Sequence, residues 1–320
     1  VLGKGFVLTP EHAADLIQRD PRNKDVLFPY LNGEDLNSRP DCSASRWVIN
    51  FHDWSEERAR SYPEVFSRVE RDVKPERLKN NRKVRRERWW QYAERAPKLY
   101  RTIGDMGRVL VVARVSKTGL PLFVPTGQVI SEATVVFATD RPADLALLSS
   151  SIHYAWAIAR ASSLKGDLRY TPSDVFETLP YPVPSVGMKA AGNNLDHLRA
   201  ELMGERGLGL TKLYNLMHDS TVSDLGIFNL RKIHQEIDCA TVEAYGWTDL
   251  DFCHDFHETS RGIRYGINVS SQIEILDRLL ELNHMQHSID PSPISDGTNA
   301  NGHSLLSSGT IGGASDPVLF

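Results

Sequence analysis

"RVLVVARVSKTGLPLFVPTGQVISEATVVFAT" occupies residues 108–139 and holds three Val-rich runs, at 108–116, 120–125 and 133–139. Gly and Pro separate these runs, and such punctuation between β-branched segments is typical of strands joined by short turns. The stretch therefore predicts an antiparallel β-meander. The shorter run "RWVINF" (46–51) predicts a further strand on its N-terminal side.

Helical patterns lie on both sides of these strands. Tyr62, Phe66, Val69 and Val73 recur at spacings of 4, 3 and 4, which indicates the buried face of a helix. Residues 143–163 predict one long buried helix, and a lone histidine within it, His153, is expected to be a core residue with its polar atoms satisfied. Further apolar stripes at helical spacing follow residue 225.

These patterns predict an α+β protein, in which a mixed domain with an antiparallel meander and packed helices precedes a small all-α domain. The Pro-rich segment 180–184 predicts a linker between them. We therefore expect domains at 1–182 and 183–288. The tail at 289–320 is mostly Ser, Gly, Asn, Asp and Pro, a composition that predicts disorder.

Charge is distributed unevenly along a chain whose net charge is −4. Residues 1–180 contain 28 basic and 23 acidic side chains, whereas residues 181–320 contain 9 and 18. Such asymmetry suggests that the first half binds a polyanion.

Cysteine usage and the lack of targeting segments indicate the cytoplasm. The three cysteines lie far apart and form no CxxC pair, so neither a disulfide scaffold nor a zinc ribbon is expected. The first residues lack the apolar run of a signal peptide. The longest uncharged run, 145–159, is too short and too polar to span a membrane.

Catalytic motifs are missing from the sequence. It has no GxSxG, HExxH, P-loop or GxGxxG motif, and no Asn-Pro-Pro-aromatic run. One loose match to a PD…DxK nuclease site remains as an alternative, with Asp41 and Asp72 holding Mg²⁺ and Lys74 steadying the attacking water.

The segment "DFCHDFHE" (251–258) is the one place where metal ligands cluster. His254 and His257 could share a metal on a helix, but no second ligand cluster stands at zinc spacing. We expect instead a helix with Phe252 and Phe256 on one face, and no metal.

A basic segment follows the helix at 62–73. Residues 74–101 contain eleven Lys and Arg against three Glu, a net charge of +8. Arg82, Arg85 and Arg86 would share one face of a helix and could neutralise DNA phosphates. The adjacent Trp89 and Trp90 would either stack on bases and sugars or pack beneath the arginines.

The segment "LKGDLRY" (164–170) has side chains suited to base recognition. Lys165, Asp167 and Arg169 alternate, so they project from one side if the backbone is extended. Lys and Arg donate to guanine O6 and N7, and Asp accepts from cytosine N4. From the residues alone, a surface turn with an internal salt bridge is favoured over base recognition.

Several segments, taken in order, resemble those of a known family. The segments "GKGFVLTPEHA", "DPRNKDVLFPYLNGEDLNSRPD", "ERWWQYAERAPKLYRTI", "LLSSSIHYAWA" and "LRYTPSDVFETLPYP" resemble, in order, the target-recognition domain of MmeI-like type IIG/IIL restriction-modification enzymes. "GLTKLYNLMHD", "LRKIHQEIDCATVEAYGW" and "EILDRLLELNH" resemble the helical C-terminal domain that follows. The resemblance covers about residues 1–286.

The resemblance implies a sequence-specific double-stranded DNA recognition module of an adenine-N6 DNA methyltransferase and type II restriction enzyme. It implies that Lys165, Asp167 and Arg169 contact bases in the major groove. S-adenosylmethionine and Mg²⁺ would serve the full-length enzyme and bind outside this chain. The methyltransferase and nuclease domains would lie on a missing or separate chain. The residues expected to face the DNA backbone are Arg82, Lys83, Arg85, Arg86, Arg88 and Lys117.

A non-enzymatic alternative also remains. The basic face could dock an acidic protein partner, in which case the chain would not bind DNA at moderate salt.

Overall fold

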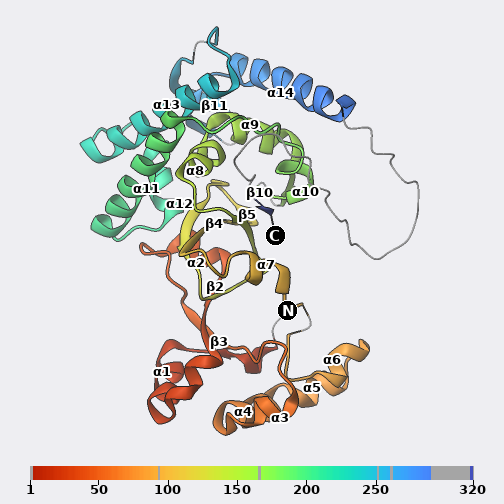
Figure 1. Cartoon of the computed structure of the whole chain (residues 1–320). Helices are drawn as coiled ribbons and strands as arrows, with labels where there is room; N and C mark the ends of the chain where they lie inside the picture. The colour runs from red at the N-terminus through yellow and green to blue at the C-terminus, as the bar shows by residue number, and fades with distance from the viewer. Residues whose placement is uncertain are drawn as a thin grey trace.

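The computed structural model describes residues 3–92, 94–164, 167–250, 252–259, 262–289 and 318–319. Helices and antiparallel sheets occur together, which confirms the predicted α+β class. Figure 1 shows the chain passing from an N-terminal lobe at the bottom, through the sheets, to long C-terminal helices at the top. Among the described helices, none has an apolar stretch long enough to cross a membrane.

The N-terminal lobe packs around an apolar core that extends from Phe6 to Trp90. The predicted stripe at 62–73 lies in this core, where Phe66, Val69 and Val73 are buried. The elements of the lobe are η1 (Lys4–Phe6), α1 (Pro10–Arg19), η2 (Pro21–Asp25), α3 (Glu56–Arg60), α4 (Pro63–Asp72), α5 (Lys74–Leu78) and α6 (Lys83–Glu87).

A four-stranded sheet connects this lobe to the rest of the molecule. Its order is β1 (Val7–Leu8), β3 (Arg46–Ile49), β2 (Leu27–Leu31) and β7 (Val129–Ile130). The run "RWVINF" forms β3, as predicted. The pairing of β2 with β7 is parallel, and the other two pairings are antiparallel.

A second four-stranded sheet contains the three Val-rich runs. Its order is β13 (Val318–Leu319), β8 (Thr134–Ala138), β4 (Arg108–Ala113) and β6 (Leu122–Pro125), and all pairings are antiparallel. The antiparallel pairing was predicted, but the meander order was not correct, because β4 lies between β6 and β8. The chain between β6 and β8 leaves this sheet to pair β7 with β2.

A third, smaller sheet is formed by segments that are distant in sequence. Its order is β5 (Val115–Ser116), β10 (Asp167–Arg169) and β9 (Ser162–Leu164), with both pairings antiparallel. Two short helices, α2 (Gly33–Ser38) and α7 (Pro97–Thr102), lie among the sheets (Figure 1).

The single helix predicted at 143–163 is instead two helices. α8 (Pro142–Ser149) ends where Ser150 adopts an extended conformation, and α9 (Ser151–Arg160) begins immediately after it. The Ser150 hydroxyl accepts a hydrogen bond from the His153 amide, so this serine is the N-cap of α9. The end of the predicted helix, from Ser162, belongs to β9. α10 (Pro172–Val175) follows β10.

Long helices dominate the C-terminal part. They are α11 (Val186–Arg206), α12 (Leu210–Met217), α13 (Leu225–Tyr245) and α14 (Val269–Ile289). The segment 251–258, predicted to be helical, contributes instead to a β-hairpin of β11 (His254–Thr259) and β12 (Gly262–Ile267). Phe256 lies opposite Tyr265 in that hairpin, so an aromatic cross-strand pair replaces the expected helix face.

One apolar core continues from the sheets into these C-terminal helices, including residues from Leu31 to Leu279. Helix α11 approaches α8 so closely that a Cβ added at Gly192 would lie 1.8 Å from the Pro142 carbonyl oxygen. Arg108 on β4 also forms a 2.7 Å ion pair with Asp196 on α11. The predicted division at residue 182 therefore crosses a packed interface, and the two-domain boundary stays a prediction.

The predicted disordered tail lies mostly outside the described residues. Val318 and Leu319 are described, and they form the edge strand β13 beside β8, with Val318 opposite Ala138. For these two residues the structure shows a strand where the composition predicted disorder.

Candidate nucleic-acid interface

The third sheet carries two of the three residues that were predicted from the sequence to recognise bases. Leu168 is buried and lies opposite Ser116 on β5. Successive residues of a strand face opposite sides, so the neighbouring Asp167 and Arg169 share the other side of β10. Asp167 is half-buried and Arg169 is exposed. The third predicted residue, Lys165, lies outside the described residues.

Asp167 and Arg169 are chemically available. Within the described part of the chain, neither side chain has a hydrogen-bond or ion-pair partner. The internal salt bridge that was the alternative for this segment is therefore not formed between these two side chains. A carboxylate and a guanidinium lie two residues apart on one face with their acceptors and donors unused.

Lys117 lies in the turn that follows β5. Ser116 pairs with Leu168 and Val115 with Arg169, so one more step of the register brings Lys117 opposite Asp167. The Ser116 Oγ atom accepts hydrogen bonds from the amides of Thr118 and Gly119, at 3.1 and 3.3 Å. Gly119 has φ of +64°, which a side chain would strain. This turn therefore holds exposed Lys117 beside the pair on β10, and we call these three residues the β10 face.

Buried side chains fix β10 to the core. Tyr170, which follows the strand, places its hydroxyl 3.0 Å from His153 Nε2 on α9. Burial lowers the pKa of His153 to about 4, so its imidazole is neutral near pH 7. His153 is thus a hydrogen-bonded core residue, as the sequence predicted.

Most of the cations that the sequence predicted to contact phosphates in the basic segment have partners within that segment. The helix within it, α6, spans only Lys83–Glu87, and Arg82 is its N-cap residue. Five of the six cations predicted to contact phosphates lie in this segment, and four of these five have partners. The pairs are Arg82 with Glu94 at 3.1 Å, Lys83 with Glu87 at 3.6 Å, Arg85 with Glu94 at 3.7 Å, and Arg86 with the carbonyls of Asn80 and Asn81. Arg88 is exposed and has no side-chain partner among the described residues.

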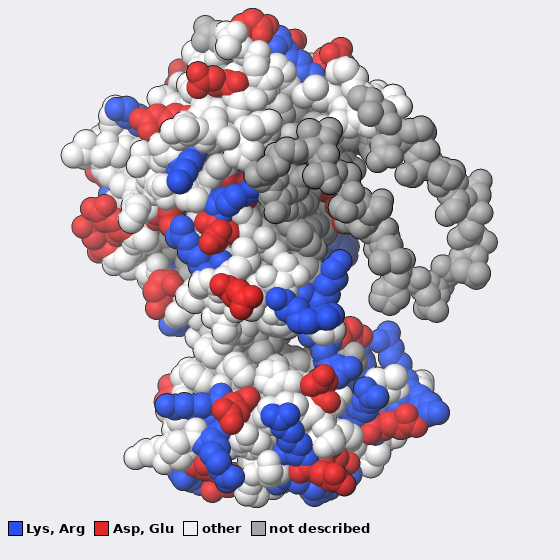
Figure 2. Space-filling model, viewed as in Figure 1, with Lys and Arg blue, Asp and Glu red and all other residues white. Residues whose placement is uncertain are grey.

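The surface charge agrees with this distribution. Figure 2 shows Lys and Arg side chains gathered over the N-terminal lobe and the narrow region above it, with acidic side chains among them. The net +8 of the segment is therefore spread over a surface of mixed sign. Among the five cations of this segment that were predicted to contact phosphates, Arg88 is the one without a partner in the described structure.

Both tryptophans of the basic segment are buried. Trp89 and Trp90 are 4% and 8% exposed and belong to the core of the N-terminal lobe. The Trp90 indole N–H donates to the Trp54 carbonyl at 3.0 Å. Trp89 lies edge-on to Phe66, and the Lys74 ammonium lies 4.7 Å from its ring centre. Of the two alternatives, this geometry is that of packing residues.

The residues of the alternative nuclease site are not brought together. Asp41 accepts hydrogen bonds from the backbone and hydroxyl of Ser43. Asp72 pairs with Arg71 at 2.6 Å, and Lys74 pairs with Glu70 at 2.8 Å. Among the described residues, no group of three His, Cys, Asp or Glu is arranged to hold a metal.

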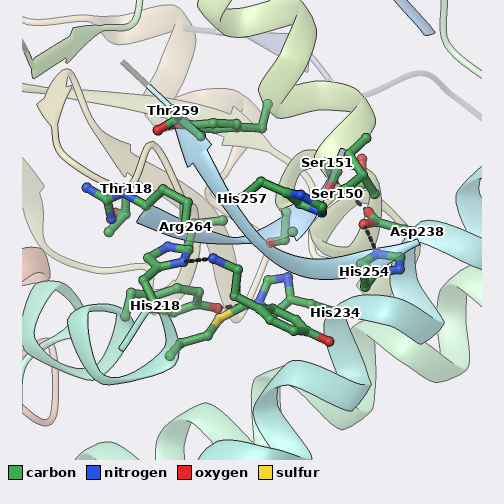
Figure 3. Close-up of a pocket in the computed structure, with 18 of the residues that line it drawn as sticks. Thr118, Ser150, Ser151, His218, His234, Asp238, His254, His257, Thr259 and Arg264 are labelled. Carbon is green, nitrogen blue, oxygen red and sulfur yellow. Dashed lines mark hydrogen bonds and ion pairs between the residues drawn. The ribbon is translucent and has the colours of Figure 1, made fainter. Parts of the chain in front are cut away.

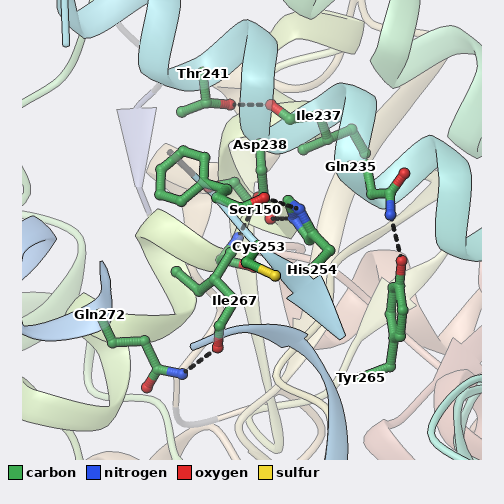
Figure 4. A network of polar contacts seen from close by, with 12 residues as sticks. Ser150, Gln235, Ile237, Asp238, Thr241, Cys253, His254, Tyr265, Ile267 and Gln272 are labelled. Atoms are coloured by element: carbon green, nitrogen blue, oxygen red, sulfur yellow. Dashed lines mark hydrogen bonds and ion pairs between the residues drawn. The ribbon is translucent and has the colours of Figure 1, made fainter. Parts of the chain in front are cut away.

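His254 and His257 lie on strand β11 instead of a helix. Three residues apart on a strand, they project to opposite faces and cannot share a metal as they would on a helix. The His254 Nε2 atom lies 2.8 Å from Asp238 on α13. The Asp238 carboxylate also accepts a hydrogen bond from the Ser151 amide at 2.6 Å, so it binds the start of α9 (Figure 4).

A cavity of about 190 Å³ lies beside the β10 face and was not predicted from the sequence. Figure 3 shows side chains from the α8–α9 junction, α12, α13 and the β11–β12 hairpin converging on it. Lys117 and Thr118 also line it, together with apolar side chains such as Leu120 and Ile158. These segments are distant in sequence, so local spacing gave no signal for the cavity.

Comparisons with known proteins identify a family for the N-terminal part of the chain and a similar fold. A family model described as "MmeI, target recognition domain" matches residues 1–183. Among solved structures, the chain is similar to the type IIL restriction-modification enzyme MmeI in complex with DNA, with a TM-score of 0.62 and 20% sequence identity. The alignment covers 89% of this chain and 34% of that chain, so this chain spans about a third of the length of the solved enzyme. At this identity the likeness shows the fold. No curated protein matches the chain.

Proposed function

Because the chain belongs to the family of MmeI target recognition domains, we propose that it recognises a specific sequence in double-stranded DNA. The observation that carries this proposal is the β10 face. Asp167 and Arg169 lie on a strand anchored by the buried Leu168, Lys117 lies in a fixed turn, and Asp167 and Arg169 have no described partner. Unpaired polar groups on a rigid element are what base recognition needs.

The chemistry of this face suits the major groove, where each base pair has a distinct pattern of donors and acceptors. The Asp167 carboxylate would accept from cytosine N4, and Arg169 would donate to guanine O6 and N7. Lys165 and Asp167 together have the donor and acceptor set to read one G·C pair. Lys117 and Arg88 would contact phosphates and set the register of the protein on the duplex.

We further propose that the chain serves an adenine-N6 DNA methyltransferase and restriction enzyme in the cytoplasm. The described residues do not fit the cofactors of such an enzyme. They contain no group of three metal-binding side chains, and the sequence has no glycine-rich loop for S-adenosylmethionine. Mg²⁺ and S-adenosylmethionine would therefore bind to methyltransferase and nuclease domains beyond this chain or on a separate one.

Selection of bound duplexes from a random-sequence pool, at about 50 and 200 mM salt, tests the proposal, because salt reveals the phosphate contribution. We expect one short motif to be enriched at both salt concentrations. Salt-sensitive binding without a motif would contradict base recognition by this chain alone. No binding at either concentration would favour the protein-docking alternative.

A further inference from the structure

Two unpaired cations lie at the cavity beside the β10 face. Lys117 is exposed in the turn after β5, and Arg264 is half-buried on β12 (Figure 3). Within the described residues, neither side chain has a carboxylate partner. The two cations come from parts of the chain about 150 residues apart in sequence, yet they line one cavity.

His218 adds a neutral donor to the same cavity. Its Nδ1 atom accepts a hydrogen bond from the Tyr265 amide at 3.1 Å, which leaves the ring proton on Nε2. Burial, together with the nearby Arg264 and Arg231, lowers the pKa of His218 to about 4. The imidazole is therefore neutral near pH 7 and presents an N–H group.

Ser149 contributes a hydroxyl without a partner. Its Oγ atom is buried, lines the cavity, and has no hydrogen-bond partner in the described structure. A buried hydroxyl without a hydrogen bond is costly, so such a group usually indicates a missing partner. The C-terminal end of α8 thus offers a donor to whatever occupies the cavity.

The carboxylate in this lining is already engaged. Asp238 is the one acidic residue among the described lining residues, and it contacts His254 Nε2 and the Ser151 amide. Figure 4 shows the Asp238 carboxylate lying between Ser150 and His254. The cavity therefore presents cations and hydrogen-bond donors, with its carboxylate taken up by its own partners. This combination suits an anion with several acceptor oxygens.

We propose that this cavity binds a phosphate group, and that the phosphate belongs to the backbone of DNA lying on the β10 face. The second part rests on the proposed function. Lys117 belongs both to the β10 face and to the cavity, so a duplex read by Asp167 would bring its backbone to the cavity mouth. The hairpin and α12 would then hold the DNA from the C-terminal side and fix its register.

A matched pair of variants of the full chain tests the phosphate contact. Arg264→Gln removes one positive charge inside the cavity, and Lys232→Gln removes one on the exposed side of α13, outside the cavity. Fluorescence anisotropy with a fixed duplex, over a series of salt concentrations, gives the slope of log affinity against log salt. We expect Arg264→Gln to weaken binding about fivefold for all sequences and to reduce that slope by about 1. Lys232→Gln should leave the slope unchanged, and Arg264→Lys should largely restore it.

A second arm separates DNA phosphate from free phosphate. Thermal unfolding is followed with and without inorganic phosphate, and we expect phosphate to stabilise the parent chain more than Arg264→Gln. Phosphate could stabilise the parent chain more than Arg264→Gln while Arg264→Gln and Lys232→Gln have equal salt slopes for DNA binding. That result would show that the cavity binds free phosphate and not the DNA backbone. If the two variants have equal salt slopes, and phosphate stabilises the parent chain and Arg264→Gln equally, the proposed phosphate site in the cavity is wrong. If the parent chain binds no duplex, the proposed function fails, while the phosphate arm still tests the cavity.

Discussion

The hydroxyl of Tyr170 lies 3.0 Å from Nε2 of His153, and this buried contact connects the end of β10 to α9. Tyr170→Phe removes the hydroxyl but keeps the ring that packs on Phe137. We expect a loss of about 1–3 kcal/mol in the free energy of unfolding, because His153 loses a buried partner. Urea unfolding measures this loss.

The same variant should also affect base recognition. Asp167 and Arg169 lie within three residues of Tyr170, so a looser strand end should lower the ratio of specific to non-specific DNA affinity. The ratio is measured for the parent and Tyr170→Phe under conditions where both are fully folded. If the ratio is the same for both, the contact between Tyr170 and His153 serves stability alone. Tyr181→Phe, which changes another core tyrosine away from β10, is the control.

Asp167→Ala should relax base preference at one G·C position. The carboxylate is unpaired and half-buried on the β10 face, and each good base contact discriminates by about 1–3 kcal/mol. Duplex selection with the parent and the variant gives the preference at each position. If every position keeps its preference in Asp167→Ala, the role proposed for this residue is wrong.

Arg88→Gln should weaken binding to all duplexes alike and lower the salt slope by about 1, because Arg88 is exposed and unpaired. Arg82→Gln should have a smaller effect, since Arg82 already pairs with Glu94 at 3.1 Å. Anisotropy titrations at several salt concentrations compare the two. A larger effect from Arg82 would mean that its ion pair opens when DNA binds.

The sequence predicted the elements whose pattern is local. The Val-rich runs form β4, β6 and β8, and the stripe from Phe66 to Val73 is buried. The break at Ser150 was missed because apolar spacing continues through it, while the cap depends on one hydroxyl. The hairpin at 254–267 was missed because Phe252 and Phe256 have helical spacing, although Phe256 pairs across the strands with Tyr265.

The candidate site could be predicted in part for the same reason. Alternation in "LKGDLRY" placed Asp167 and Arg169 on one side, as β10 places them. Lys83 pairs with Glu87 one helical turn away, whereas the pairing of Arg82 and Arg85 with Glu94 follows from the fold. The net charge of the segment therefore overstated how many of its cations are free of partners. Ser149, His218 and Arg264 meet through tertiary packing, which no sequence spacing reveals.

Acid should destabilise the folded chain through three buried histidines. Burial lowers the pKa values of His153 and His218 to about 4 and that of His234 to about 3, against about 6.5 in the unfolded chain. Between pH 6.5 and 4 the unfolded chain therefore binds protons that the folded chain does not, so stability falls as pH falls. For three sites we expect the free energy of unfolding to be about 4 kcal/mol lower at about pH 5.5 than at about pH 7.5.

Urea unfolding at the two pH values checks this dependence. His153→Gln should remove about a third of it, because one of the three titrating groups is lost. Equal free energies of unfolding at both pH values would show that these histidines are not held neutral in the folded state.

Trp89→Ala should act on stability and leave DNA affinity nearly unchanged. Trp89 is buried against Phe66 and Trp90 in the core of the N-terminal lobe, where removing such a side chain costs about 3–5 kcal/mol. Val84→Ala is the matched control in the same segment, because Val84 is 58% exposed and its truncation should change stability by less than about 0.5 kcal/mol. Urea unfolding gives both values, and anisotropy is measured at a temperature where both variants are folded. A folded Trp89→Ala variant that loses more DNA affinity than Arg88→Gln would restore the stacking role and show that this tryptophan leaves the core when DNA binds.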